Sequence, residues 1–237
     1  MSQTSYGKLY LVPTPIGNLK DITLRALEIL KTVDMVACED TRRSGLLLDH
    51  YGLHKRKISY FEHNEIRRIP QIIQMLTEGL SVAVISDGGS PGLSDPAYRL
   101  VRAAIDSGII VEALPGATAV IPALTASGVP TDRFFFEGFL PVKPNKRRTR
   151  LKELQAFDHT VVIYESVHRI KKTMADVVDI FAGRMVCVAR EISKMHEEII
   201  RGPAEEVGAA IASSTPKGEY VIVISGDIDR KGKAAPV

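Results

Sequence analysis

Five short apolar runs in the first half of the chain are each followed by a stretch with helical periodicity, and this alternation restricts the fold more than any other feature. The apolar runs cover residues 8–14, 34–40, 57–62, 81–86 and 109–115. The helical stretches cover residues 21–33, 42–51, 66–79, 95–108 and 116–128. Strands that alternate with helices form a parallel sheet with right-handed crossovers. Because the runs are apolar throughout, we expect helices on both faces of this sheet.

Particular residues indicate where some of these helices begin and end. Asp21 and Asp95 precede helical stretches and are typical N-caps, and Pro96 suits the first turn of the helix that follows. Gly79 and Gly108 come directly after helical stretches, where glycine is common because it adopts left-handed backbone angles. Asp21, Asp95, Gly79 and Gly108 are therefore expected at helix termini.

The pattern changes near residues 128–132, where we place a domain boundary. We therefore expect an N-terminal α/β domain at residues 1–128 and a C-terminal α/β domain at residues 129–237. The predicted strands of the second domain cover residues 133–140, 159–166, 184–191, 197–202 and 218–225, and its predicted helices cover residues 148–157, 167–181 and 204–213. With fewer helices per strand, a mixed sheet with antiparallel members fits this domain best.

Composition and charge exclude several classes of protein. Hydrophobic residues make up 45% of the 237 residues and the net charge is only +3, as in an ordinary globular protein with a sizeable core. Cys38 and Cys187 lie inside apolar runs, which predicts buried free thiols in a reducing compartment. No apolar run approaches the length of a membrane span, so we expect a cytoplasmic protein without a membrane segment.

Polar or glycine-rich turns follow all five predicted strands of the first domain. In an open parallel sheet, ligands bind beyond the carboxyl ends of the strands, so these turns should form one rim. Any one such turn could be a plain connection, since turns favour Gly, Pro, Asp and Asn, but five together favour a binding cleft. The turns cover residues 13–18, 39–43, 61–65, 86–96 and 115–119.

The composition of the rim narrows the ligand. Neither the dinucleotide fingerprint G-x-G-x-x-G nor the phosphate loop G-x-x-x-x-G-K-[ST] is present. Pro13 and Pro15 lack the backbone donors that a phosphate would use, and Asp87 would repel it. A ligand with hydroxyl, ammonium or sulfonium groups fits better, and S-adenosylmethionine has all three.

Nine motifs in order carry a resemblance to a known family. They are "VPTPIGNLKDITLRAL", "CEDTRRS", "EHNE", "SDGGSPGLSDP", "PGATA", "GFLP", "YESVHR", "REISKMHEE" and "KGEYVIVI". Together they resemble the bacterial ribosomal RNA small subunit methyltransferase I family of the tetrapyrrole methylase superfamily. The resemblance extends from about residue 9 to residue 225.

The resemblance implies a fold, a reaction and a set of cofactor residues. It implies two α/β domains that hold S-adenosylmethionine in the cleft between them, in a homodimer. It implies methylation of the 2′-hydroxyl of a cytidine in the decoding region of 16S ribosomal RNA within the small ribosomal subunit. The implied cofactor-binding residues are Pro13, Asp87, Gly88, Gly89, Ser90, Pro91, Ala117, Thr118, Tyr164, Glu165, Ser166, Ile192, Ser193, Gly218, Glu219 and Tyr220.

A ribose hydroxyl is a weak nucleophile, so the reaction should need a group that takes its proton. Asp40 is our first candidate and His63 the second, followed by Glu39 and Lys194. The other explanation for Asp40 is a helix cap or an ion-pair partner of a nearby arginine. We expect no catalytic metal, because no third ligand accompanies the histidine pair of residues 50 and 54.

A dense basic run after the domain boundary is the predicted RNA-binding surface. Cationic side chains that contact phosphates would supply affinity and make it fall with salt. A solvated loop and helix start is the alternative explanation for such a run. The predicted RNA-binding residues are Arg42, Lys143, Lys146, Arg147, Arg148 and Arg150.

Two other functions remain open at this point. A methyltransferase of the same fold could act on a small tetrapyrrole-like substrate, which would not need the basic run. A ribosome-binding module without catalysis would not need the glycine-rich turns. Binding of S-adenosylmethionine, followed by methyl transfer to small ribosomal subunits, would distinguish the three.

Overall fold

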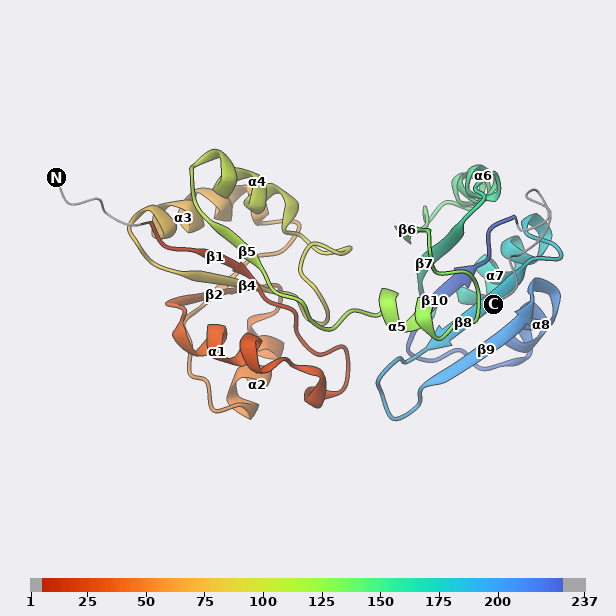
Figure 1. Ribbon diagram of the computed structural model, residues 1–237, viewed down its shortest axis with the longest axis horizontal. Helices are drawn as coiled ribbons and strands as arrows, with labels where there is room; N and C mark the ends of the chain where they lie inside the picture. Colours follow the sequence, from red (N-terminus) through yellow and green to blue (C-terminus); the bar gives the residue numbers. More distant parts are fainter. Residues whose placement is uncertain (1–5, 228–237) are drawn as a thin grey trace. The chain divides into compact units, whose positions relative to one another are not determined.

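Ten strands form two five-stranded sheets in the computed structural model, which describes residues 6–227 (Figure 1). Each sheet belongs to one of two units, which span Met1–Thr118 and Ala119–Val237. Within the described residues, each predicted strand and each predicted helix is present. The predicted two-domain α/β fold, with one parallel and one mixed sheet, is thereby confirmed.

The first sheet is parallel throughout, with strand order β3-β2-β4-β1-β5. In the central strands, Leu9 pairs with Val82 on one side and with Val111 on the other. Every strand therefore points its carboxyl end toward the same edge. The strands are β1 (Leu9–Leu11), β2 (Met35–Cys38), β3 (Lys57–Ser59), β4 (Val82–Ile85) and β5 (Val111–Ala113).

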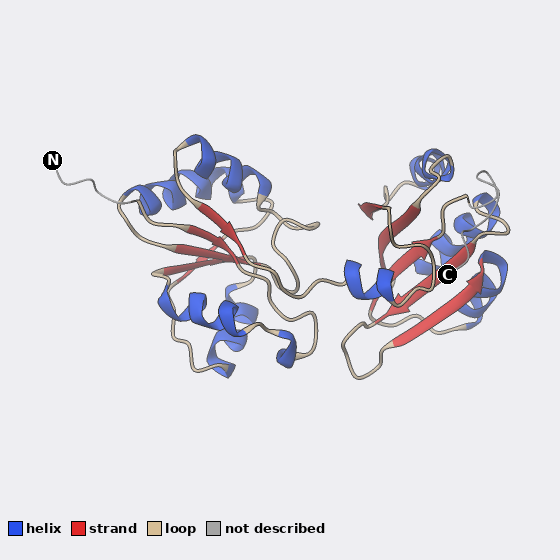
Figure 2. Ribbon diagram, in the orientation of Figure 1, coloured by secondary structure: helices blue, strands red, loops and turns tan. Residues whose placement is uncertain are grey.

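Helices cover both faces of the first sheet, as the apolar strands require (Figure 2). Helices α1 (Leu24–Thr32) and α2 (Thr41–His50) lie on one face, and α3 (Glu65–Thr77) and α4 (Tyr98–Asp106) lie on the other. Alternate residues of β4 serve the two cores: Val82 and Val84 join the cluster of α3 and α4, whereas Ala83 and Ile85 join that of α1 and α2. All four side chains are buried.

Two predicted helix caps are wrong. The N-cap of α1 is Thr23, whose hydroxyl accepts the Ala26 N–H at 3.0 Å. Asp21 is instead the last residue of a short 3₁₀ turn, η1 (Leu19–Asp21). It therefore lies two residues before Thr23, the extended residue that caps the helix. Helix α4 begins at Tyr98 after Ala97, which makes no side-chain cap bond, so Asp95 lies outside the helix.

The second sheet is mixed, with strand order β6-β7-β10-β8-β9. Strands β6 and β7 are parallel, and the three other pairs are antiparallel. A bulge between Phe136 and Gly138 shifts the register of β6. The strands are β6 (Phe134–Phe139), β7 (Thr160–Ser166), β8 (Met185–Arg190), β9 (Glu198–Pro203) and β10 (Glu219–Ile224).

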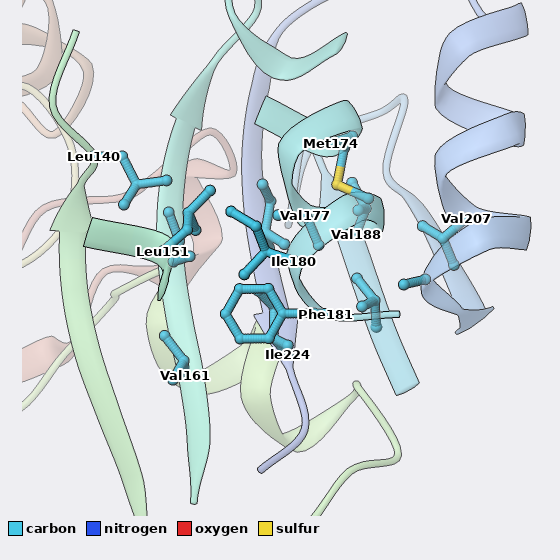
Figure 3. Close-up of a cluster of buried hydrophobic side chains, with 14 of the residues drawn as sticks. Leu140, Leu151, Val161, Met174, Val177, Ile180, Phe181, Val188, Val207 and Ile224 are labelled. Carbon is cyan, nitrogen blue, oxygen red and sulfur yellow. The ribbon is translucent and has the colours of Figure 1, made fainter. Parts of the chain in front are cut away.

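A single large cluster of apolar side chains forms the main core of the second unit. Its helices are α6 (Pro144–Gln155), α7 (Ile170–Ile180) and α8 (Ala204–Ser213). Figure 3 shows Phe181 and Ile180 in the middle of this cluster, with Leu151 of α6 on one side and Val207 of α8 on the other. The apolar spacing of α7 thus places it at the centre of the layer that covers the sheet.

The boundary between the units falls earlier than the sequence analysis placed it. Helix α5 (Val120–Thr125) contacts β10 and belongs to the second unit. Its C-terminal end is also held there, because the Arg201 guanidinium donates to the Ala126 carbonyl at 2.7 Å. The loop at residues 128–132, predicted as the boundary, connects α5 to β6 inside that unit.

Cys38 and Cys187 are buried free thiols, as predicted. Burial raises the pKa of both thiols. In the described part of the chain, no helix combines the length and the apolar character needed to cross a membrane.

Candidate functional site

The turns after β1 to β5 all lie at the carboxyl edge of the first sheet, because the five strands run in the same direction. This confirms that the polar turns share one rim. Ligands of open α/β sheets bind at this edge. The turns are residues 13–18, 39–43, 61–65, 86–96 and 115–119.

Hydrogen bonds join three of these turns within the first unit. Thr14 and Gly89 exchange two backbone hydrogen bonds, each with an N–O distance of 2.9 Å. The Thr14 hydroxyl donates to the Ser86 carbonyl at 3.0 Å, and the Ser90 hydroxyl donates to the Ala117 carbonyl at 3.0 Å. Gly89 has φ +96°, a conformation that favours glycine. The turn of residues 86–96, called the glycine turn below, is therefore fixed against the turns after β1 and β5.

The carboxylate of Asp40 is used locally. It caps α2 by accepting the Arg42 N–H at 2.8 Å, and it also lies 3.5 Å from the Arg42 guanidinium. The backbone hydrogen bond from Arg42 is the main reason why the pKa of Asp40 is lowered. A carboxylate with a lowered pKa is a weaker proton acceptor. The helix cap and arginine partner, which the sequence left as an alternative, describe Asp40 in this structure.

Asp87 connects the second and fourth turns. Its carboxylate accepts the Asp40 N–H at 3.3 Å and pairs with Arg43 at 3.2 Å. Its own N–H donates to the Glu39 carboxylate at 3.5 Å. The ends of β2 and β4 are thus linked through acidic side chains next to the glycine turn.

Two carboxyl groups at this edge, those of Glu39 and Asp95, have raised pKa values and therefore keep their protons to a higher pH than usual. Burial raises the pKa of Glu39, against the lowering effect of the hydrogen bond from the Asp87 backbone. Burial, together with the charges of Glu39 and Asp87, raises the pKa of Asp95 to about 7, although the hydrogen bond with the Ser86 hydroxyl acts in the opposite direction. The sequence analysis missed this property of Asp95. The sequence did offer one signal. Asp95 lies in the turn after β4, and a parallel sheet places this turn at the same edge as the acidic residues that follow β2.

The other two candidate bases have different surroundings. His63 is exposed, with its ring edge-on to Phe61 at 6.1 Å between centroids. Lys194 pairs with Glu191 at 2.8 Å and with Glu219 at 3.0 Å. Burial alone would lower the pKa of Lys194, but these two hydrogen bonds outweigh burial and leave the pKa raised. A lysine held in its protonated form is not suited to accept a proton.

Two pockets open on the first unit beside the glycine turn. One has a volume of about 360 Å³ and is lined by Pro15, Gly17, Leu19, Arg43, Ser44, Leu46, Leu47, His50, Ser86 and Asp87. The other has a volume of about 320 Å³ and is lined by Glu62, Glu65, Ser94, Asp95, Pro96, Ala97, Tyr98 and Arg99. Residues of the glycine turn or of its continuation toward α4 contribute to both.

The predicted cofactor segments of the second unit come together at one edge of its sheet. In the β10–β7 pairing, Glu219 lies opposite Ser166 and Tyr220 lies opposite Glu165. The Glu191 N–H donates to the Glu219 carbonyl at 3.0 Å, which places the turn after β8 beside the same strand end. The remaining predicted cofactor residues of these segments are Tyr164, Ile192, Ser193 and Gly218.

Backbone strain marks the turn after β8. Glu191 and Ser193 have φ values of +51° and +66°, which are unusual for residues with a Cβ atom. Gly218 has φ +77°, and a Cβ atom on it would lie 2.2 Å from the Glu191 carboxyl carbon. The positive φ favours glycine at this position, and the Glu191 side chain occupies the space that a Cβ atom would take.

Glu165 is buried and engaged inside the second unit. Its carboxylate pairs with Arg169 at 2.7 Å and accepts hydrogen bonds from Thr173 at 2.6 Å and from the Ser166 N–H at 2.7 Å. Only 2% of the residue is exposed. These contacts explain Glu165 as a residue that shapes the turn after β7.

Three arginines of the basic run form ion pairs with acidic residues of their own unit. Arg147 pairs with Asp176 at 2.7 Å, and only 5% of its side chain is exposed. Arg148 pairs with the same Asp176 at 2.7 Å, and Arg150 pairs with Glu137 at 2.8 Å. The burial of Arg147 and the pairing of all three arginines favour a structural role for them.

The exposed cations of the predicted RNA surface are fewer than the sequence suggests. Lys143 and Lys146 are exposed near the start of α6. Arg42 belongs to the first unit, and 89% of its side chain is exposed beside Asp40.

The described residues contain no group of three or more His, Cys, Asp or Glu side chains that could hold a metal ion. His50 and His54 are both exposed, and His54 lies 3.6 Å from Asp49.

Comparisons with known proteins agree on one family. The model of the family "Tetrapyrrole (Corrin/Porphyrin) Methylases" matches residues 8–208. A ribosomal RNA small subunit methyltransferase I from Escherichia coli O157:H7 is 45% identical over 95% of this chain and 80% of that protein. A protein of the same name from Mesorhizobium japonicum is 48% identical over 94% of this chain and 79% of that protein.

Two solved structures with the same fold are methyltransferases by name. Uroporphyrin-III C-methyltransferase from Thermus thermophilus, complexed with S-adenosylhomocysteine, has a TM-score of 0.64 at 19% identity, covering 95% of this chain and 100% of that chain. Cobalt precorrin-4 methyltransferase has a TM-score of 0.65 at 20% identity, covering 95% of this chain and 97% of that chain. At this identity the likeness shows the fold alone.

Proposed function

Because the chain belongs to the tetrapyrrole methylase family, we propose that it transfers a methyl group from S-adenosylmethionine to the 2′-hydroxyl of a cytidine in the decoding region of 16S ribosomal RNA. The observation that carries this proposal is the name shared by its relatives, ribosomal RNA small subunit methyltransferase I, at 44–48% identity over most of the chain. S-adenosylmethionine is the methyl donor of the family.

The residues of the first unit suit this donor. S-adenosylmethionine carries a sulfonium and an ammonium group, and the edge of the sheet offers the carboxylates of Asp87 and Glu39 next to exposed main chain at Gly88. A Cβ atom on Gly88 would lie 3.4 Å from the Pro15 carbonyl oxygen, so the turn runs close to its neighbour with no side chain between them. We propose that residues 87–91 and 117–118 hold the donor from the first unit.

The segments of the second unit that we propose to contact the donor are residues 164–166, 192–193 and 218–220. Their side chains and strained turns lie beside one another at one edge of the second sheet. Glu165 would contribute through the backbone it holds, since its carboxylate is used by Arg169 and Thr173.

The methyl group of the donor is already activated, so the protein's part in the chemistry is alignment and removal of one proton. The ribose oxygen must lie in line with the methyl carbon and the sulfur, near van der Waals contact. A stacked helix hides its ribose edges, so the target nucleotide is expected to be unpaired or turned out when it binds. Carboxyl groups at the edge of the first sheet lie beside the glycine turn and are candidates to accept this proton.

We propose that Lys143 and Lys146, which are exposed, contact the phosphates of the RNA. Exposed lysines that neutralise phosphates release counterions, so binding should weaken as salt increases. Arg147, Arg148 and Arg150 would instead hold α6 in place through their ion pairs.

Methyl transfer from radiolabelled S-adenosylmethionine tests the proposed function. Small ribosomal subunits that lack the modification should be labelled, and the labelled nucleotide should resist alkaline hydrolysis, since a 2′-O-methyl group blocks attack on the adjacent phosphodiester. Mass spectrometry of nuclease fragments then identifies the base and its position. Label on a base atom, or on a nucleotide outside the decoding region, would refute the proposal in its specific form.

The same assay separates the two alternatives. A small tetrapyrrole offered in place of subunits should accept no label, and its methylation would favour the alternative substrate class that the structural neighbours have. Calorimetric titration with S-adenosylmethionine distinguishes a binding module without catalysis, which would take up no donor. The expected homodimer and cytoplasmic location stay predictions, and light scattering on the purified protein tests the first.

A further inference from the structure

Asp95 lies in the connection from the glycine turn to α4 and is not used by the helix. The N-cap position belongs to Ala97, and no side chain caps the helix there. The carboxyl group is half-buried and lines the 320 Å³ pocket, together with Tyr98 and Arg99. A carboxyl group is therefore placed at the edge of the sheet, next to the proposed donor turn, where it can be reached from a pocket.

Acidic groups predominate around Asp95. Glu39 and Asp87 act on it from the ends of β2 and β4, and Ser86 is the nearest hydroxyl. Glu62 and Glu65 line the same pocket.

The cations nearby are used elsewhere. Arg99 pairs with Glu65 at 3.2 Å, and Arg43 pairs with Asp87 at 3.2 Å. Among residues 6–227, no basic group is a cause of the shift in the pKa of Asp95. With a pKa of about 7, the Asp95 carboxyl group changes its protonation state near neutral pH. This matches the requirement that a general base titrate near the working pH.

We propose that Asp95 is the group that takes the proton from the attacking ribose hydroxyl, an inference that rests on the proposed function. In this step the ribose oxygen forms a bond to the methyl carbon while the bond from that carbon to sulfur breaks. The electron pair of the broken bond stays on sulfur, which becomes a neutral thioether. The hydroxyl proton moves to the Asp95 carboxylate and leaves later to solvent. No other reactant is needed.

The other carboxyl groups at this edge are less suited to the step. Asp40 caps α2 and has a lowered pKa. Asp87 is paired with Arg43. Glu39 has a raised pKa and is the strongest competitor, so the experiment must separate it from Asp95.

The test is the pH dependence of turnover on unmethylated small subunits at saturating S-adenosylmethionine. For the wild type, kcat should rise about tenfold per pH unit at low pH and level off once the one essential carboxylate is ionised. Asp95→Asn should lower the plateau by about 100-fold or more and remove this rise, because an amide accepts no proton. Its affinity for the donor, measured by calorimetry, should equal that of the wild type.

A matched control lies on the helix that follows. Asp106 is exposed and pairs with Arg102 at 3.1 Å, so Asp106→Asn should keep the wild-type plateau and pH profile. Asp95→Asn with wild-type turnover and the wild-type pH profile would overturn the inference while leaving the proposed function intact. A wild-type protein that labels no small subunit would instead overturn the proposed function.

A second pair of variants decides the matter if Asp95→Asn does not fold. Glu39→Gln removes a charge that raises the pKa of Asp95, so the rise in kcat should move to lower pH. Ser86→Ala removes the hydroxyl that lowers this pKa, so the rise should move to higher pH. Opposite displacements support Asp95 as the acceptor. Loss of both turnover and the pH-dependent rise in Glu39→Gln would identify Glu39 as the acceptor and overturn the inference.

Discussion

Two neighbouring residues of the basic run, Lys146 and Arg147, should respond to substitution in opposite ways. Both were predicted to bind RNA, yet only Lys146 is exposed. The Nε and Nη2 atoms of Arg147 each lie 2.7 Å from the same carboxylate oxygen of Asp176, and 5% of the Arg147 side chain is exposed. Arg147→Met would remove this pair, and Lys146→Met is its matched control.

The size of the loss follows from what remains around Asp176. Removing one partner of a buried pair costs about 3–5 kcal/mol, because the other charge stays buried. Here the second carboxylate oxygen keeps Arg148 at 2.7 Å, but that arginine is 38% exposed and compensates only in part. We therefore expect Arg147→Met to lower the free energy of unfolding by about 3 kcal/mol. An exposed lysine contributes little, so Lys146→Met should change it by less than about 0.5 kcal/mol.

Urea denaturation and subunit binding measure the two effects separately. Arg147→Met should shift the unfolding transition of the second unit to lower urea and leave the salt dependence of binding unchanged while the protein is folded. Lys146→Met should leave the transition in place and reduce the slope of log K against log salt by about 1. An unchanged transition for Arg147→Met, together with a reduced salt slope, would show that this arginine serves the RNA and that the ion pair contributes little.

Three further outcomes follow from the geometry. Thr23→Ala should destabilise the protein by about 1 kcal/mol in thermal unfolding through loss of the α1 cap, whereas Asp21→Ala should have a smaller effect. Gly218→Ala should cost about 1 kcal/mol or more, because its φ of +77° disfavours a Cβ atom, and because that atom would collide with Glu191; a wild-type melting temperature would contradict the close approach. The pKa of Asp95 is raised from 3.8 to about 7, so the folded state holds a proton that the unfolded state releases between these values, and stability falls as pH rises through this window. Asp95→Asn should therefore gain more in melting temperature over the wild type at pH 8 than at pH 5, and an equal difference at both would argue against the shift.

The elements and their order were predictable because they depend on local patterns. Residues 82–85 are apolar at every position, which requires burial on both faces, and the structure assigns alternate residues of β4 to two cores. The position of the five polar turns at one edge then follows from parallel strands alone. Helix α5 shows the limit of this reasoning, since its sequence continues the first pattern but its contact with β10 assigns it to the second unit.

The basic run shows why a charge pattern does not specify a surface. The sequence gives the number of cations near the start of α6, but not the direction in which each side chain points. Three of these arginines form ion pairs within the second unit. Their partners are Asp176, on the later helix α7, and Glu137, on the earlier strand β6. Those partners are distant in sequence, so no local pattern could indicate them. The exposed Lys143 and Lys146 are what remains for a partner.

The acids that follow β2 and β4 make the same point about chemistry. The strand pattern placed Glu39, Asp40 and Asp95 near one edge, and the sequence analysis named Asp40 as the first candidate base. A backbone N–H at the start of α2 lowers the pKa of Asp40, whereas burial raises that of Glu39 and of Asp95. Proton affinity therefore depends on the nearest hydrogen-bond donors and on burial in loops, and neither is encoded in residue type. The direction of parallel strands predicts that carboxyl groups in these turns lie at one edge of the sheet. The hydrogen bonds and burial within each turn then determine which of them accepts a proton.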